Sequence, residues 1–277
     1  IGKPFMQTTL KTLIASHAGE NPAIGAPGRN WLNYDELRAL SAEVGKSLNA
    51  MGIDASDRVA IVLPNGPEMA TAFVSIAQAA TTAPLNPGYR QEEYAFYLED
   101  LKAKALLVAD GYDGPAYSAA RSLGMDVIRL CVPADAPAGY FTLSSEIAAT
   151  PATKEPTADD IALILHTSGT TSRPKIVPLL QSNVAASALH IQTSLKLSPA
   201  DRCMNVMPLF HIHGLIAAVT ASVASGASIW CAPGFDALKF FGWMREAHPT
   251  WYTAVPTMHQ AILTRAARNS DVIDTVP

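Results

Sequence analysis

Charge is scarce in this sequence of 277 residues. Charged residues make up 16% of the chain, whereas an average soluble domain holds roughly 25%. The formal net charge is −4, and there is neither a run of Lys and Arg nor an acidic tail. A nucleic-acid-binding surface needs such a basic run, so no nucleic acid is expected as a partner. Small-molecule chemistry is favoured, and the shortage of charge fits a fragment whose surface is normally covered.

Cysteine is also scarce. Cys131, Cys203 and Cys231 are far apart and form no CxxC pair, which excludes a readable disulfide framework or zinc ribbon. We interpret all three as small buried hydrophobic residues. This usage favours a cytoplasmic protein.

Membrane and export signals are missing too. The chain opens without a basic segment, apolar stretch and cleavage site, so no secretory signal is expected. Residues 203–235 contain no Asp, Glu, Lys or Arg, and about 20 apolar residues would suffice to cross a bilayer. However, Pro208, His211 and His213 interrupt this stretch, and Ser225-Gly226 divides it. We therefore expect a buried helix followed by a buried strand, and no membrane span.

Strand-like and helix-like segments alternate along most of the chain. The clearest helix is expected over residues 34–51, with Asn33 as its N-cap and Glu36 completing a capping box. Further helices are expected over 67–80, 115–123 and 183–195 and after residues 214, 236 and 257. Strands are expected over 58–63, 105–109, 127–132, 161–166, 203–206, 228–231 and 251–255. This alternation predicts an α/β fold with mostly parallel sheets covered by helices on both faces.

The segment 133–156 interrupts this alternation. It is rich in Ala and Pro, so an irregular connection is expected there. We accordingly predict two α/β parts, residues 1–156 and 157–277. The chain ends without a closing element, so we expect residues 1–277 to be the N-terminal portion of a larger, truncated domain.

A polar loop follows the strand expected over 161–166. Its residues are Thr167, Ser168, Gly169, Thr170, Thr171, Ser172, Arg173, Pro174 and Lys175. Hydroxyl and backbone N–H groups can donate to phosphate oxygens, and a lysine adds positive charge. The loop is no Walker A element, because Pro174 rather than glycine precedes Lys175. From composition alone, a solvated turn stays the alternative to a polyphosphate site.

A second motif surrounds two histidines in residues 208–214. His211 and His213 could be ordinary core histidines, or half of a metal site. No third or fourth ligand is evident nearby, so no metal site is predicted.

The loop 167–175 resembles the signature phosphate loop of the adenylate-forming superfamily, which includes acyl-CoA synthetases, luciferases and peptide-synthetase adenylation domains. Five other stretches resemble the family in order and spacing, namely residues 32–37, 58–65, 84–87, 207–214 and 255–257. Residues 172–175 and 251–256 resemble the oxalate–CoA ligase branch in particular. Ser172 and Ile176 depart from the commonest pattern, which has glycine at both positions, and Ile176 would not easily take positive φ.

The resemblance implies activation of a carboxylic acid with ATP and Mg²⁺, followed by transfer to coenzyme A. It implies that His211 and Lys175 are catalytic and that six residues bind the ATP phosphates: Thr167, Ser168, Gly169, Thr170, Thr171 and Lys175. The implied acyl pocket contains His211, His213, Val255 and Pro256. A histidine at position 213 would make this pocket polar and favour a small dicarboxylate such as oxalate. A fatty or aromatic acid is the alternative substrate.

Three further family motifs are not found in the sequence. They are the Tyr-Gly-x-Thr-Glu stretch near adenine and Mg²⁺, the Thr-Gly-Asp stretch near ribose, and a catalytic lysine near the C-terminus. We therefore expect the C-terminal domain to be absent from this chain and residues 1–277 alone to be inactive. A nucleotide-binding module without catalysis is the remaining alternative.

Overall fold

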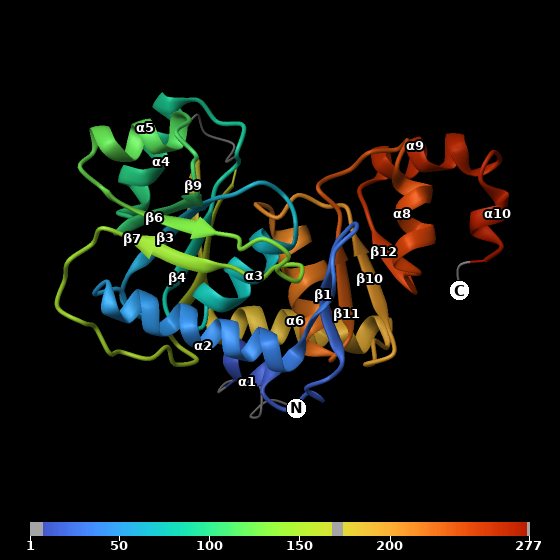
Figure 1. Ribbon diagram of the computed structural model, residues 1–277, viewed down its shortest axis with the longest axis horizontal. Helices are drawn as coiled ribbons and strands as arrows, with labels where there is room; N and C mark the ends of the chain where they lie inside the picture. The colour runs from blue at the N-terminus through green and yellow to red at the C-terminus, as the bar shows by residue number, and fades with distance from the viewer. Residues whose placement is uncertain (1–7, 168–173, 276–277) are drawn as a thin grey trace.

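A computed structural model describes residues 8–167 and 174–275. Two sheets stand side by side in it (Figure 1). The first has seven strands in the order β7-β6-β5-β3-β4-β8-β9, and the second has five in the order β12-β10-β11-β1-β2. All neighbours pair in parallel except β1–β2, β6–β7 and β8–β9, which are antiparallel pairs at sheet edges. The predicted mostly parallel α/β fold is confirmed.

The strands of the seven-stranded sheet are β3 (Arg58–Val62), β4 (Thr81–Pro84), β5 (Ala105–Ala109), β6 (Asp126–Cys131), β7 (Thr142–Ser145), β8 (Ile161–Thr167) and β9 (Lys175–Leu180). Those of the five-stranded sheet are β1 (Pro22–Gly25), β2 (Leu32–Asn33), β10 (Arg202–Asn205), β11 (Ser228–Cys231) and β12 (Trp251–Thr253). The helices between them are α1 (Leu10–Ile14), α2 (Tyr34–Ala50), α3 (Pro67–Ile76), α4 (Gln91–Leu101), α5 (Pro115–Ser122), α6 (Gln181–Leu195), the π-helix η2 (His213–Thr220), α7 (Ala221–Ala224), α8 (Phe240–Ala247), α9 (Pro256–Ala266) and α10 (Ser270–Ile273).

Helices cover both faces of each sheet. The outer face of the seven-stranded sheet packs on α4 and α5, and the outer face of the five-stranded sheet packs on α8, α9 and α10. The largest core lies between the sheets and contains α2, α3, α6, η2 and α7. Side chains alternate between these cores, so Cys203 of β10 faces the central core while Met204 faces the outer one. Alternation of this kind is the period-2 geometry of a strand covered on both faces.

Local sequence signals explain the elements that were predicted. Asn33 accepts a hydrogen bond from the backbone N–H of Glu36, whose carboxylate accepts from the N–H of Asn33, so the expected capping box begins α2. The strands β3 and β5 lie within one residue of their expected bounds. The structure also contains elements that the sequence pattern did not predict: α1, β1, β2, β4, α4, β7, β9 and α10.

The two sheets do not divide the chain at residue 156. The strands β8 and β9 come after it but complete the seven-stranded sheet, while β1 and β2 come near the start but join the five-stranded sheet. Each sheet thus contains strands from before and after residue 156. The division of the chain into parts 1–156 and 157–277 stays a prediction about domain organisation.

The uncharged stretch 203–235 forms β10, a loop, η2, α7 and β11. This is the buried helix and strand that the sequence predicts. Among residues 8–167 and 174–275, no helix has the length and apolar character needed to cross a membrane.

Candidate active site

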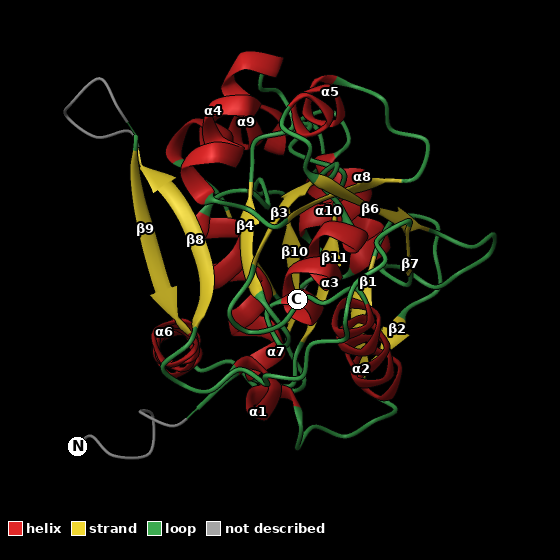
Figure 2. Cartoon of the chain, turned by 90° about the vertical axis from the view of Figure 1, so that its left-hand side faces the viewer, coloured by secondary structure: helices red, strands yellow, loops and turns green. Residues whose placement is uncertain are grey.

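The predicted phosphate loop joins β8 to β9 in an antiparallel hairpin. Thr167, the last residue of β8, lies opposite Lys175, the first residue of β9, and solvent reaches both side chains. Ser168, Gly169, Thr170, Thr171 and Ser172 lie outside the described residues. Figure 2 shows the hairpin at the edge of the molecule, with α6 at the opposite end of its strands. The strand β9 thus separates the loop from the expected helix, α6. Ile176 has the extended backbone of β9, which a β-branched residue adopts readily.

His166 lies near the end of β8, next to the phosphate loop, and connects this strand to α4. Its Nε2 lies 3.2 Å from Oδ2 of Asp100, and its ring meets the edge of Tyr97 at a centroid distance of 4.6 Å. The side chain is 7% exposed. Burial lowers the pKa of His166, and the hydrogen bond to Asp100 opposes but does not overcome this effect. The ring is therefore neutral at neutral pH, and its Nε2–H donates to the carboxylate. Asp100 and Tyr97 were not predicted as site residues, because α4 is far away in sequence.

The histidine motif follows β10 in the five-stranded sheet. His213 is the first residue of η2, and its Nε2 lies 2.7 Å from Oγ1 of Thr253 at the end of β12. This contact follows from the register of two parallel neighbours, in which Asn205 of β10 lies opposite Thr253. The structure therefore brings His213 together with a hydroxyl that was not singled out, although it lies in the quoted stretch 251–256.

His211 lies beside the ring of Phe210, with 4.3 Å between the ring centroids. Solvent reaches the side chain, yet desolvation by its surroundings lowers the pKa of His211. The imidazole is consequently neutral near pH 7 and offers one N–H donor and one acceptor nitrogen. Such a group can hydrogen-bond a carboxylate or phosphate oxygen through its N–H.

A glycine and an asparagine determine the path of the chain between β10 and η2. A Cβ on Gly214 would lie 2.5 Å from the carbonyl oxygen of Pro208, so only glycine permits this close approach. Buried Asn205 donates to the carbonyl oxygen of Met207 and accepts from its N–H. The motif 208–214 is therefore a turn with a specific backbone requirement.

Val255 and Pro256 begin α9, directly after β12. Val255 is the half-buried N-cap and Pro256 the exposed first helical residue, a position where proline costs no hydrogen bond. Both thus lie after the same strand end that carries Thr253. Their place in an acyl pocket with His211 stays a prediction. Among the described residues, no three His, Cys, Asp or Glu side chains group as metal ligands.

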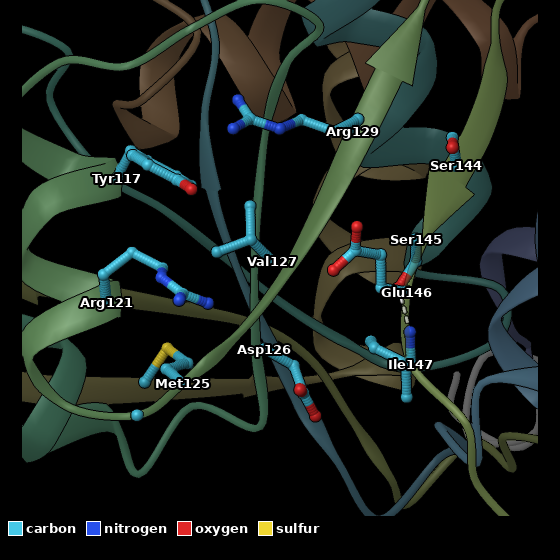
Figure 3. Close-up of a pocket in the computed structure, with 11 residues that line it drawn as sticks. Tyr117, Arg121, Met125, Asp126, Val127, Arg129, Ser144, Ser145, Glu146 and Ile147 are labelled. Carbon is cyan, nitrogen blue, oxygen red and sulfur yellow. Dashed lines mark hydrogen bonds between the residues drawn. The ribbon is translucent and has the colours of Figure 1, made fainter.

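A separate cavity of about 510 Å³ lies over β6, between α5 and β7. Arg121 of α5, Arg129 of β6 and Glu146, which follows β7, are among the residues that line it (Figure 3). None of the predicted site residues lines it. It lies near the β7 edge of the seven-stranded sheet, whereas the hairpin forms the opposite edge, so it is not part of the candidate site.

Comparison with known proteins identifies the family to which the sequence belongs. The sequence profile of a family described as AMP-binding enzyme matches residues 13–274. Oxalate–CoA ligase of Arabidopsis thaliana is 38% identical over 274 residues, which cover 95% of this chain and 53% of that protein. Oxalate–CoA ligase of Saccharomyces cerevisiae is 36% identical over 231 residues, covering 75% of this chain and 42% of that protein.

Solved structures show the same fold. The crystal structure of ATP-bound MatB from Rhodopseudomonas palustris superimposes with a TM-score of 0.77 at 27% identity, covering 92% of this chain and 50% of that one. The chain thus spans about half the length of the relatives that it matches. With a profile match over nearly all of its residues and this shared architecture, the chain belongs to the family of AMP-binding enzymes.

Proposed function

We propose that the protein activates a small dicarboxylic acid, oxalate being the first candidate, with ATP and transfers it to coenzyme A. Because the chain spans about half of its relatives, the complete reaction is proposed for a protein that also carries the other half of the family sequence. Residues 1–277 alone are expected to bind phosphate weakly at most and to be inactive.

The observation that carries the proposal is the hydrogen-bonded pair of His213 and Thr253. Their contact of 2.7 Å fixes a polar, half-buried ring two residues after His211. A second carboxylate needs a donor at the distal end of the acid, which an aliphatic side chain cannot supply. If the Thr253 hydroxyl donates to Nε2, the remaining N–H of His213 lies on Nδ1 and is free to donate to the acid. The two oxalate–CoA ligases among the relatives support the same class of substrate.

The first step is an in-line attack of a carboxylate oxygen on the α-phosphorus of ATP. The bond from this phosphorus to the bridging oxygen breaks, pyrophosphate leaves, and an acyl-adenylate forms. Catalysis of such a step depends on positioning and on charge stabilisation. Lys175 and the hydroxyl and backbone groups of Thr167, Ser168, Gly169, Thr170 and Thr171 would hold the phosphates. Mg²⁺ would neutralise part of their charge when bound.

His211 would orient the acid for that attack. Its lowered pKa keeps the ring neutral, so its N–H can bond the carboxylate without the ring binding a second proton. In the second step the sulfur of coenzyme A attacks the acyl carbon, the carbon–oxygen bond to AMP breaks, and the thiol proton is lost. AMP and the acyl-CoA thioester are the products.

Two assays on the full-length protein test the proposal. Acid-dependent exchange of radiolabelled pyrophosphate into ATP reports the first step, and AMP release in the presence of coenzyme A reports both. We expect oxalate to give the highest kcat/KM in a panel with malonate, short fatty acids and coumarate. Activation of the monocarboxylic acids alone would overturn the dicarboxylate assignment, and no exchange with any acid would overturn the reaction.

The variant His213→Ala tests the acid pocket. It should lower kcat/KM for the dicarboxylate about tenfold to a hundredfold, the usual range for loss of a hydrogen bond to a charged group, and leave a short fatty acid nearly unaffected. His190→Ala, in α6, is a control histidine outside the motif. Equal losses for all acids would contradict a role of His213 in selecting the substrate.

A further inference from the structure

Asn65 links the two sheets close to the histidine motif. It lies in the turn between β3, a strand of the seven-stranded sheet, and α3. Its Oδ1 accepts a hydrogen bond of 2.8 Å from the backbone N–H of Leu209, and its Nδ2 donates one of 3.1 Å to the carbonyl oxygen of Ala232. Both partners belong to loops of the five-stranded sheet. One side chain thus connects the ends of β3, β10 and β11.

The chemistry of both contacts specifies a carboxamide. A backbone N–H can only donate and a backbone carbonyl can only accept, so the orientation of the amide is fixed by its partners. An aspartate would keep the acceptor for Leu209 but lose the donor to Ala232. An alanine would lose both.

Leu209 is two residues before His211, and its side chain is 1% exposed. The loop that contains it has two side-chain anchors among the described residues. Asn205, at the end of β10, hydrogen-bonds the backbone of Met207, and Asn65, next to β3 of the other sheet, hydrogen-bonds the backbone of Leu209. The turn at His211 then follows by backbone bonds, because the N–H of His211 donates to Pro208 and that of Leu215 donates to His211.

The seven-stranded sheet also carries the predicted phosphate hairpin, β8–β9. Activation of an acid requires the carboxylate held near His211 to meet the α-phosphorus of a nucleotide held by that hairpin. Reacting atoms must lie about 3–3.5 Å apart, and a misplacement of about 1 Å can cost a hundredfold in rate. The hydrogen bond between Asn65 and Leu209 connects the two sheets beside His211. It can therefore affect how the carboxylate near His211 aligns with the nucleotide at the hairpin.

We propose that Asn65 is a positioning residue for the acid-activation step. It fixes the loop of His211 relative to the sheet that carries the phosphate hairpin, without touching either substrate. This inference rests on the proposed function, and it gives a role to Asn65, the last residue of the family-like stretch 58–65, to which the sequence assigned none.

The test uses Asn65→Ala and Asn65→Asp in the full-length protein, with Asn33→Ala as the matched control. Asn33 also makes a hydrogen bond through its carboxamide, but it caps α2 and is not part of the loop. We expect Asn65→Ala to lower kcat about tenfold to a hundredfold, as a small misplacement does, with little change in the KM for ATP. Asn65→Asp should lie between wild type and Asn65→Ala, since it keeps the bond to Leu209.

Hydrogen–deuterium exchange supplies a readout that is independent of activity. The backbone amides of residue 207 and of residues 209–213 should exchange faster in Asn65→Ala than in wild type. In Asn33→Ala their exchange rates should equal those of wild type, even if both variants have the same lowered melting temperature. Unchanged kcat with Asn65→Ala, or equal kcat losses in Asn65→Ala and Asn33→Ala, would overturn the inference while the proposed function stands. Wild-type protein that activates no acid would overturn both, and that outcome is visible without any variant.

Discussion

The two loops that carry the predicted chemistry leave their sheets in different ways. The phosphate loop leaves β8 and returns as β9 at a sheet edge, with Thr167 and Lys175 exposed at its ends (Figure 2). The histidine loop leaves β10 in the interior of its sheet and enters η2 through buried Leu209 and Gly214. On one side of the phosphate loop, β9 pairs only with β8 among the described strands, whereas the histidine loop is held by buried Leu209 and by hydrogen bonds to Asn205 and Asn65.

This contrast separates two ways of building a site. An exposed side chain next to the phosphate loop, such as Lys175, can be replaced without disturbing a core, so its loss should change ligand binding alone. A change inside the histidine loop disturbs buried contacts, so stability and chemistry should fall together. Four experiments test this distinction.

The largest effect is expected for Lys175→Met. A hydrogen bond to a charged group contributes about 1.5–3 kcal/mol, so the KM for ATP should rise about tenfold to a hundredfold. The free energy of unfolding should change by less than about 0.5 kcal/mol because the side chain is exposed. Steady-state kinetics and urea unfolding measure the two quantities. Lys46→Met, at another exposed lysine, should leave both unchanged, and an unaltered KM in Lys175→Met would remove this residue from the phosphate site.

Gly214→Ala should combine both losses. The new Cβ would lie 2.5 Å from the Pro208 carbonyl oxygen, and such overpacking costs about 1–3 kcal/mol of unfolding free energy. The acid-dependent rate should fall as well, because the backbone of the histidine loop must move. Gly242→Ala in α8 is the control, since its Cβ would meet nothing within 4 Å. Equal stability of the two variants would show that the loop has room and is not fixed by packing.

Thr253→Val should have a smaller and selective effect. The substitution keeps the shape but removes the hydroxyl that bonds His213, a contribution of about 1 kcal/mol. We expect kcat/KM for the dicarboxylate to fall about fivefold, as that energy implies, while Thr253→Ser retains wild-type kinetics. A fall of similar size in Thr253→Ser would indicate that the methyl group, and not the hydroxyl, matters.

The smallest effect concerns the pH dependence of stability. Burial depresses the pKa of His166 below its ordinary value of 6.5, so the unfolded chain binds this proton more readily than the folded one. The contribution of His166 is therefore complete above about pH 6.5 and is lost as the pH falls from there toward the folded pKa. His166→Gln should show a smaller drop in melting temperature between about pH 7.5 and about pH 5. An identical drop would assign the acid sensitivity to other groups, such as His17 or His211.

Sequence patterns predicted the elements whose signals are local. The helix α2 begins at a capping box and keeps its apolar residues at helical spacing, and β3 and β5 are short apolar runs. The strand β9 was missed because Pro178 interrupts it. Proline is tolerated there because β9 is an edge strand. The strand β4 was missed because its residues are small and polar, although Thr81 and Thr82 bond carbonyl oxygens of Ile161 and Ala162.

The candidate site was predictable to the same extent. Lys175, His211 and His213 were predicted from motifs that are continuous in the chain, and their roles stay predictions. The residues that bond to the two loops from elsewhere in the chain were not predicted. Asp100 bonds His166, Thr253 bonds His213 and Asn65 bonds Leu209, and only the fold brings these pairs together. No spacing in a single sequence reports a hydrogen bond between residues that are 144 positions apart, as Asn65 and Leu209 are.

The pairing of β1 with β11 has a consequence for the order in which the protein can fold. Ile24 of β1 lies opposite Ile229 of β11, so the first strand must wait for a partner that the ribosome makes much later. At about 5–20 residues per second, this wait is on the order of 10–40 s. During that time the apolar side chains of β1 lack their native cover. We expect the five-stranded sheet to close after the seven-stranded sheet during synthesis, and nascent chains that end before residue 228 to depend on chaperones for solubility.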